Sequence, residues 1–269
     1  MTQNKKVNIV TGYSNPGGST LAFTRLTNLL NENGYDAILY GPHPWHLDKC
    51  NAKELKDFTT DANSTLISHY VKISHDMICK KHILACHETG VFDLRRGIKE
   101  EMNLDLYDEI VFVSKSQQKW QGNPNGSVVI PNIVDDLEPI KSKMDPPVAG
   151  VVGSIDPNKQ THVSINRAKA DGFKYIDILG DMSDSKYFHT EVLPLLNRNI
   201  RYVGFCQDRQ AIYEGLTAVY HSSQRETFNF VKFECEQTGV KYCPLKSSET
   251  GAESWSKEDI LKAWDSILG

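Results

Sequence analysis

The sequence lacks several features that would place it in a common protein class. None of its six cysteines forms a C-x-x-C pair, which argues against a zinc ribbon or a thioredoxin-like motif. The N-terminus, MTQNKKVNIV, has no apolar stretch like that of a signal peptide, and no window reaches membrane-spanning length. We therefore expect a cytoplasmic protein with free thiols and no transmembrane segment.

Long runs of charge are also absent. The formal net charge is −4 over 269 residues, and there is no polybasic arm. Composition thus gives no support for binding to nucleic acid or lipid, although it excludes neither. The 39% of hydrophobic and 24% of charged residues are typical of a globular protein, and the length allows one large domain or two of ordinary size.

Two glycine-rich signatures of nucleotide binding are missing or incomplete. The G-x-G-x-x-G pattern of nicotinamide enzymes is absent. The loop TGYSNPGGST (11–20) nearly matches the phosphate-binding loop of ATPases, but Gly18 stands where the phosphate-binding lysine is needed. Gly17 and Gly18 would still let the backbone approach a ligand at a helix N-terminus, or they simply form a tight turn between a strand and a helix.

The sequence does contain a regular alternation of apolar segments and segments with helical spacing. It predicts strands at 7–11, 37–40, 82–86, 109–114, 128–131, 148–153, 175–180, 200–205, 217–222 and 240–243, and helices at 21–33, 162–170, 210–216, 228–239 and 256–268. The stretch 137–147 is rich in proline and charge and predicts a linker. We therefore predict an α/β protein with two Rossmann-like doubly wound domains, at 1–140 and 147–252, a cleft between them, and a C-terminal helix at 253–269.

Polar residues follow several of these strands, where ligands of parallel sheets bind. His87 and Glu88 follow the strand 82–86, Lys159 lies in the loop after 148–153, and Glu226 follows 217–222. Each has an ordinary alternative role, as a structural histidine, a solvated lysine or a solvated loop acid. Glu234 lies eight residues beyond Glu226, in the predicted helix, and is either a ligand contact or an acid of an amphipathic helix.

Taken in their order along the chain, these segments resemble those of the retaining glycosyltransferases of the GT-B fold, family four. The family has a Gly-Gly loop, a histidine after a strand, an IPNGVD segment, a G-R-x-x-x-x-K-G segment and a final E-x7-E segment. Here VVIPNIVDDLEP (128–139), GSIDPNKQ (153–160) and ETFNFVKFE (226–234) are similar to the last three, with Ile133, Ser154 and Gln160 as departures. The resemblance covers nearly the whole chain. Compact versions occur in phages and viruses, which would imply the host cytoplasm.

The resemblance implies a role for each matching residue. His87, Lys159 and Glu226 would be catalytic, with His87 near the reacting centre, Lys159 on the leaving phosphate and Glu226 on the donor sugar. The donor, a nucleotide-diphosphate sugar expected to be UDP-linked, would also meet Gly17, Gly18, Ser154, Arg225, Phe228, Asn229 and Glu234, the last through the ribose hydroxyls. The resemblance implies neither a metal nor another cofactor.

Three questions stay open from the sequence. Ser154 replaces the family's arginine, and Arg225, Arg167, Arg209, Arg95 and Arg96 are candidates to supply the missing charge. The acceptor is a glycan, a lipid, a protein or a hydroxymethylated base in DNA, and the loop GPHPWHLDK (41–49) offers His43, Trp45 and His46 to bind it or to pack against the core. A sugar-nucleotide epimerase of the same fold and a non-catalytic nucleotide- or glycan-binding protein remain alternatives.

Overall fold

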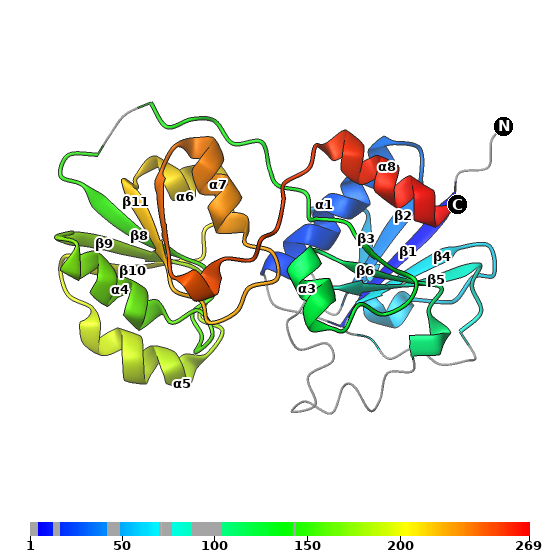
Figure 1. Ribbon diagram of the computed structural model, residues 1–269, viewed down its shortest axis with the longest axis horizontal. Coiled ribbons are helices and arrows are strands. Elements are labelled where there is room, and N and C mark those ends of the chain that lie inside the picture. The colour runs from blue at the N-terminus through cyan, green and yellow to red at the C-terminus, as the bar shows by residue number, and fades with distance from the viewer. Residues whose placement is uncertain are drawn as a thin grey trace. The chain divides into compact units, whose positions relative to one another are not determined.

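The structure, a computed structural model, describes residues 5–12, 17–41, 49–69, 71, 77–87, 104–141 and 144–269. Contacts between backbone segments divide the chain into two compact units. Unit 1 consists of Met1–Ile133 together with Gly251–Gly269, and unit 2 is the segment between them, Val134–Thr250. Unit 2 is therefore inserted into the chain of unit 1, whose last helix lies beside its first one (Figure 1).

Unit 1 is built on a seven-stranded parallel sheet in the order β3-β2-β1-β4-β5-β6-β7. The strands are β1 Lys6–Thr11, β2 Asp36–Gly41, β3 Ala52–Glu54, β4 Thr65–His69, β5 Lys81–Cys86, β6 Glu109–Phe112 and β7 Ser127–Val129. The chain winds outward from β1 to β3 and then reverses to β4. Ligands of doubly wound sheets bind at the carboxyl ends of the strands where this reversal occurs, here β1 and β4.

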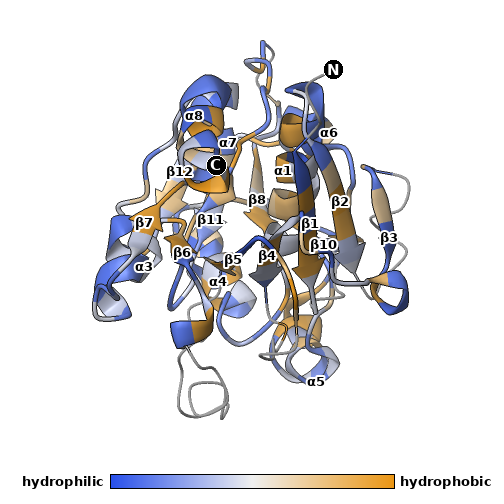
Figure 2. Ribbon diagram, turned by 90° about the vertical axis from the view of Figure 1, so that its right-hand side faces the viewer, coloured by the Kyte–Doolittle hydropathy of each residue, from blue (hydrophilic) through white to orange (hydrophobic). Residues whose placement is uncertain are grey.

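Helices from both ends of the sequence cover one face of this sheet. The described residues of unit 1 form the helices α1 Gly18–Glu32, α3 Lys115–Trp120 and α8 Lys257–Leu268, and the short 3-10 turns η2 Leu55–Asp57 and η4 Leu104–Leu106. Phe23 and Leu30 of α1 share one core with Ile260 and Trp264 of α8. The hydropathy colouring of Figure 2 shows hydrophobic residues along β1 and β2. The last helix thus completes the core of unit 1.

Unit 2 is a smaller doubly wound domain with the parallel strand order β10-β9-β8-β11-β12. Its strands are β8 Val148–Val152, β9 Tyr175–Leu179, β10 Ile200–Gly204, β11 Ala218–His221 and β12 Lys241–Pro244. Its helices are α4 Thr161–Ala170, α5 Ser185–Tyr187, η5 Phe188–Val192, η6 Leu193–Leu195, α6 Arg209–Glu214, α7 Phe230–Thr238 and η7 Lys246–Ser248. One core lies between the sheet and the segments α4, α5 and η5, and another between the sheet, α6 and α7. The winding reverses between β8 and β11.

The predicted strands and long helices are present, with ends that differ by a few residues. The sequence-based prediction missed β3, β4, α3 and the helical segment 185–195. The predicted ranges also differ from the two units: Leu137 and Ile140 pack in the core of unit 2, and the C-terminal helix belongs to unit 1. The predicted cleft stays a prediction. Among the described residues, no helix is long and apolar enough to cross a membrane.

Candidate functional site

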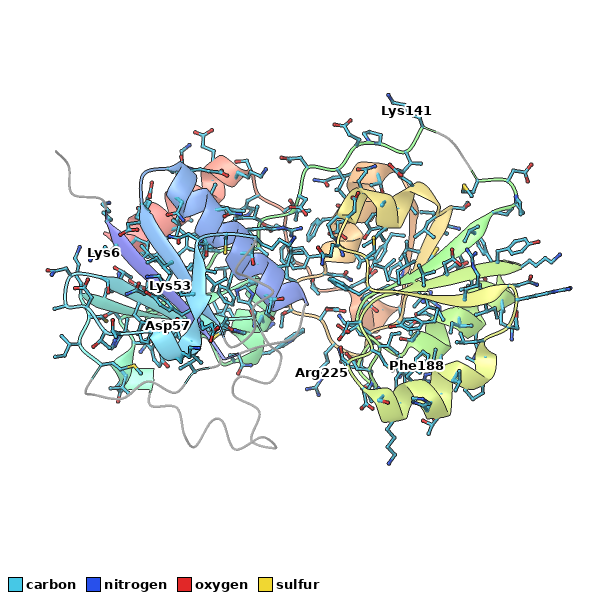
Figure 3. The ribbon with its side chains drawn as sticks, turned by 180° about the vertical axis from the view of Figure 1, so that it is seen from behind. Lys6, Lys53, Asp57, Lys141, Phe188 and Arg225 are labelled. Atoms are coloured by element: carbon cyan, nitrogen blue, oxygen red, sulfur yellow. The ribbon has the colours of Figure 1, made fainter. Side chains whose placement is uncertain are left out.

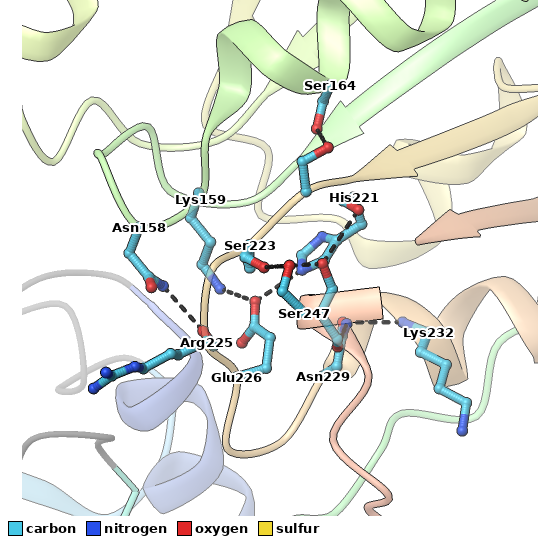
Figure 4. A network of polar contacts seen from close by, with 12 residues as sticks. Asn158, Lys159, Ser164, His221, Ser223, Arg225, Glu226, Asn229, Lys232 and Ser247 are labelled. Atoms are coloured by element: carbon cyan, nitrogen blue, oxygen red, sulfur yellow. Dashed lines mark hydrogen bonds and ion pairs between the residues drawn. The ribbon is translucent and has the colours of Figure 1, made fainter. Parts of the chain in front are cut away.

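An ion pair between a partly exposed lysine and a buried glutamate joins two loops at the strand reversal of unit 2. Lys159 comes from the loop between β8 and α4, and Glu226 from the loop between β11 and α7. The Nζ atom of Lys159 lies 2.6 Å from Oε1 of Glu226, and the Glu226 side chain is only 8% exposed. Figure 4 shows the two side chains pointing toward one another. Residues 67 positions apart in the sequence thus meet where ligands of this sheet type bind.

The surroundings keep Glu226 ionised. Burial by itself raises the pKa of this carboxyl, but the Lys159 ammonium and the hydrogen bond from His221 lower it to about 2. Nε2 of His221 lies 2.8 Å from the same oxygen, Oε1. A carboxylate can only accept hydrogen bonds, so both neighbours donate to it. Glu226 therefore offers a fixed negative charge and lone pairs at neutral pH.

Lys159 and His221, the two hydrogen-bond donors to Glu226, line a small recess at the carboxyl ends of β8 and β11. Its polar lining includes Ser154, Lys159, Thr161, Ser164, His221 and Ser222. The N-terminus of α4 opens onto it, and a helix N-terminus favours anions. A recess with one lysine and a helix N-terminus suits a phosphate group.

The backbone around the recess is shaped for close approach. Gly153 has φ 138°, a conformation that side chains rarely adopt. A Cβ on Gly180 would lie 1.8 Å from the carbonyl oxygen of Gly153, so the ends of β8 and β9 pack backbone to backbone. Gln160 begins α4 with φ 49° and ψ 49°, the left-handed region. The family pattern has glycine at this position, and the backbone here keeps the conformation that glycine favours.

Phe228 and Asn229, which the resemblance assigns to the nucleotide-sugar site, have side chains that make structural contacts. Phe228 is buried against Phe230 and Phe233, with ring centroids 5.0 Å apart in both pairs. The Asn229 side chain caps α7 by accepting a hydrogen bond from the Lys232 amide, and it donates to the Tyr242 hydroxyl at 2.6 Å. Both residues therefore stabilise the loop and the start of the helix that carry Glu226.

Glu234 lies apart from this recess, inside the core of unit 2. Its side chain is fully buried and accepts hydrogen bonds from Arg209, at 2.9 Å from Nε to Oε1, and from the Tyr213 hydroxyl. A second guanidinium nitrogen of Arg209 bonds its other oxygen. A ribose could reach Glu234 only if this ion pair opened. The two acids of the segment are thus bound by different cations, Lys159 and Arg209.

The arginines proposed to replace the family's arginine at Ser154 are placed differently. Arg167 donates to the backbone carbonyls of His221, Cys243 and Pro244, so it holds strand ends together. Arg209 binds Glu234. The Arg225 side chain is exposed and extends away from the body of unit 2 and from Glu226 (Figures 3 and 4). Arg95 and Arg96 lie outside the described residues.

In unit 1 the Gly-Gly loop forms the start of α1. Gly17 is the N-terminal cap, and its amide donates to the Thr20 hydroxyl at 2.8 Å, while that hydroxyl lies 2.8 Å from the Gly17 carbonyl. Gly18 is the first residue of the helix and is exposed. The Gly17 amide is thus occupied within the loop, which leaves Gly18 as the more accessible of the two predicted contacts.

His87 belongs to a cluster at the carboxyl ends of β1, β4 and β5. Its ring lies 4.5 Å from that of Phe23 and 5.5 Å from that of His69. Nδ1 of His69 is 2.9 Å from the Thr11 hydroxyl oxygen. Burial lowers the pKa of His87 to about 3 and that of His69 well below its usual value. Both imidazoles are therefore neutral at physiological pH.

Sequence reasoning did not assign a role to His69 or to His221. Each ends a buried strand, β4 or β11, so the rule that found His87 could have found both. The predicted acceptor residues His43, Trp45 and His46 lie outside the described residues, as does Glu88. Over the described part of the chain, no group of three or more potential ligands is arranged to hold a metal ion.

Comparison with known proteins gives a result at the level of structure. No protein-family model matches the chain, and no curated protein matches it. Several solved structures, among them WaaG, AviGT4 and an alpha-glucosyltransferase, match over nearly the whole chain. WaaG, a glycosyltransferase involved in lipopolysaccharide biosynthesis, has a TM-score of 0.64 at 13% identity and covers 97% of this chain and 90% of its own. AviGT4, a glycosyltransferase involved in avilamycin A biosynthesis, has a TM-score of 0.63 at 16% identity, with 98% and 88% covered.

The third match is an alpha-glucosyltransferase in complex with UDP and a 13-mer DNA that contains an HMU base. Its TM-score is 0.58 at 10% identity, with 98% of this chain and 89% of its own covered. The chain spans about half the length of some other structures that it matches. At these identities the matches establish the fold: the chain has the GT-B fold of glycosyltransferases, with two Rossmann-like domains.

Proposed function

We propose that this protein is a retaining, metal-independent glycosyltransferase that takes its sugar from a nucleotide-diphosphate sugar, with UDP as the expected nucleotide. The observation that carries the proposal is the Lys159–Glu226 pair at the strand reversal of unit 2, in a chain with the GT-B fold. Lys159 lines a recess that suits a phosphate and binds the ionised carboxylate of Glu226.

Each residue of the proposed site has its own part in the glycosyl transfer. In the reaction, the bond from the anomeric carbon to the leaving phosphate breaks, and an acceptor oxygen forms the new bond to that carbon. Lys159 and the N-terminus of α4 stabilise the negative charge on the leaving nucleotide diphosphate. Glu226 accepts hydrogen bonds from sugar hydroxyls. His87, neutral at physiological pH, contacts the transferred sugar as a hydrogen-bonding group and not as an acid.

Ser154 stands where the family pattern has its second cation. In this site Ser154 donates a hydrogen bond to the phosphate, and Lys159 carries the charge. Arg225, which is exposed on the same loop as Glu226, is the remaining described candidate for a second cation. Glu234 contacts the ribose only after Arg209 has moved, and this makes it the weakest of the proposed contacts.

The test for the acceptor covers several chemical classes. One structural match was solved with UDP and DNA containing an HMU base, and two others are glycosyltransferases of other biosyntheses. Hydroxymethylated DNA therefore belongs in the acceptor panel beside glycans, lipids and proteins. The net charge of −4 disfavours DNA, because phosphate neutralisation dominates DNA affinity.

Calorimetry with UDP and GDP, followed by nucleotide release from a panel of nucleotide sugars and acceptors, tests the proposal. Lys159→Met should lower nucleotide affinity about tenfold or more and turnover by about 10²–10³. Lys159→Arg keeps the charge and should lose less. Lys169→Met, an exposed lysine on α4, is the matched control and should behave as wild type.

The outcomes separate the candidate functions. Binding of neither nucleotide overturns the proposal. Binding of a nucleotide sugar without release of nucleotide for any acceptor supports the non-catalytic alternative, which the loss of the family's arginine at Ser154 favours. Conversion of a UDP-N-acetylsugar without any acceptor identifies an epimerase instead.

A further inference from the structure

His221 is a buried histidine whose ring reaches the proposed sugar-binding carboxylate. It is the last residue of β11, is 4% exposed, and lines the recess together with Lys159. Its Nε2 atom lies 2.8 Å from Oε1 of Glu226. Because Glu226 is ionised and can only accept, Nε2 must carry a hydrogen. The contact therefore fixes which ring nitrogen of His221 is protonated.

The two donors to Glu226 use the same oxygen. Lys159 and His221 both bond Oε1, at 2.6 and 2.8 Å. Within the described part of the chain, the other oxygen, Oε2, accepts no hydrogen bond, and Figure 4 shows it turned away from both donors. A carboxylate held through one oxygen presents the other in a fixed direction. Oε2 is thus an oriented acceptor for a ligand hydroxyl.

The position of His221 is itself fixed by its neighbours. Its backbone carbonyl accepts hydrogen bonds from the Leu245 amide at 2.8 Å and from Arg167 at 3.2 Å. Its ring packs against that of Tyr242, with centroids 6.1 Å apart. The Tyr242 hydroxyl in turn binds Asn229, the cap of α7. The His221 side chain lies at the end of a buried strand and is packed in this way, so it has little freedom to move.

Lys159 cannot supply the same restraint. Its side chain is 27% exposed and ends in an ammonium on a flexible four-carbon stem. In the proposed reaction, its charge is drawn toward the leaving phosphate. His221 is buried and held by its neighbours, so it is the donor that holds Glu226 while Lys159 responds to the nucleotide.

We propose that His221 is a positioning residue of the donor-sugar site: it holds Glu226 through Oε1 so that Oε2 faces the hydroxyls of the sugar. The inference rests on the proposed function and adds to it a residue that acts on the sugar through Glu226. It predicts that replacement of His221 weakens the binding of an intact nucleotide sugar more than the binding of the free nucleotide.

Calorimetry on the full chain with UDP and with UDP-glucose, UDP-galactose and UDP-N-acetylglucosamine tests this. His221→Leu should bind UDP within about twofold of wild type but lose about tenfold of its affinity for the preferred sugar nucleotide. His221→Gln, whose amide can still donate to Glu226, should recover most of the loss, whereas the shorter His221→Asn should not. Tyr35→Phe removes a hydrogen bond from a tyrosine hydroxyl to a carboxylate, that of Asp265 in unit 1, and should leave both affinities unchanged.

A second arm asks whether His221 acts through Glu226. In the Glu226→Gln background, His221→Leu should cause no further loss of sugar-nucleotide affinity, because the oriented carboxylate is already gone. Losses that add would show that His221 contacts the ligand directly and would overturn the proposal. Equal losses for UDP and sugar nucleotide, or an unchanged ratio in His221→Leu and His221→Asn, would overturn it as well. If wild type binds no nucleotide at all, the proposed function fails and this inference fails with it, whereas wild-type binding with an unchanged ratio rejects His221 alone.

Discussion

Arg209 and Glu234 form a two-point ion pair inside unit 2, with the Tyr213 hydroxyl as a third partner. Although burial lowers the pKa of Arg209, the Glu234 carboxylate raises it above its usual value. Glu234 is fully buried whereas Arg209 is 21% exposed, so removal of Arg209 would leave a buried carboxylate without its compensating charge.

Arg209→Gln should therefore lower the free energy of unfolding by about 3–5 kcal/mol. Urea denaturation of the purified protein measures this. The control is Arg201→Gln, which removes an equally two-pronged pair with Asp177 on the surface of the sheet, where Arg201 is 63% exposed. The control should lose less than about 1 kcal/mol. Equal losses in the two variants would show that burial does not set the strength of the Arg209 pair.

Glu226 should make unit 2 sensitive to acid. Its pKa in the folded protein, about 2, lies below the ordinary 4.5, so folding favours the ionised form. The resulting stabilisation is complete above pH 4.5 and is lost as the pH falls toward 2, and it amounts to about 3 kcal/mol. Glu226→Gln should flatten the decline of stability over this pH range. Glu258→Gln, in the exposed pair with Lys262, should decline as wild type does. A Glu226→Gln curve parallel to that of wild type would contradict the prediction.

Gln160 should tolerate glycine better than any other residue. Its left-handed backbone costs a non-glycine residue about 1 kcal/mol or more, which offsets the greater freedom of glycine in the unfolded chain. Gln160→Gly should leave the melting temperature unchanged or raise it, and Gln160→Val should lower it, because a β-branched residue is the most strained there. Destabilisation by glycine as large as that by valine would show that the Gln160 side chain itself matters.

Gly180 should not accept even one methyl group. A Cβ there would meet the Gly153 carbonyl oxygen at 1.8 Å, and backbone atoms cannot move aside as a flexible side chain can. Gly180→Ala should cost about 3 kcal/mol or more and should disturb the recess beside Lys159. Gly215→Ala, with nothing within 4 Å of its Cβ, is the matched control and should be nearly neutral. A comparison of the melting temperatures of the two variants tests this prediction.

His87 should show no titration near neutral pH. Burial holds its pKa at about 3, so the ring nitrogens carry a single proton from pH 5 to 9. The NMR signal of its ring should stay constant over this range, and its assignment can be made with His87→Gln. A titration midpoint between pH 5 and 8 would mean that the ring is accessible enough to act as a general acid.

The alternation of strands and helices could be read from the sequence because most strands contain a short apolar run, such as Ala37–Leu39 in β2 and Ile83–Ala85 in β5. The strand β4 was missed because Thr65, Ser68 and His69 are polar, although the structure buries all of its residues. Central strands of a parallel sheet tolerate such residues when partners satisfy them, as Thr11 does for His69. Hydrophobic patterning cannot detect a partner that is 58 residues away.

The candidate site was predictable in part for the same reason. The positions of Lys159 and Glu226 after apolar strands placed both at the carboxyl end of the sheet, and the structure brings the two within hydrogen-bonding distance. The burial of Glu234 with Arg209 and the contact from His221 could not be anticipated, because each depends on how α6, α7 and β11 pack together. Spacing in the sequence gives the order of such residues but not their partners.

The insertion of unit 2 between two parts of unit 1 determines which half of the molecule can be isolated. Residues 134–250 form one continuous segment and can be expressed as a single fragment. Unit 1 can be obtained only by excising that segment and joining Ile133 to Gly251 with a short linker, so that α8 still reaches the core it shares with α1. A stop codon placed before α8 would remove Ile260 and Trp264 and would expose the core residues of unit 1 against which they pack.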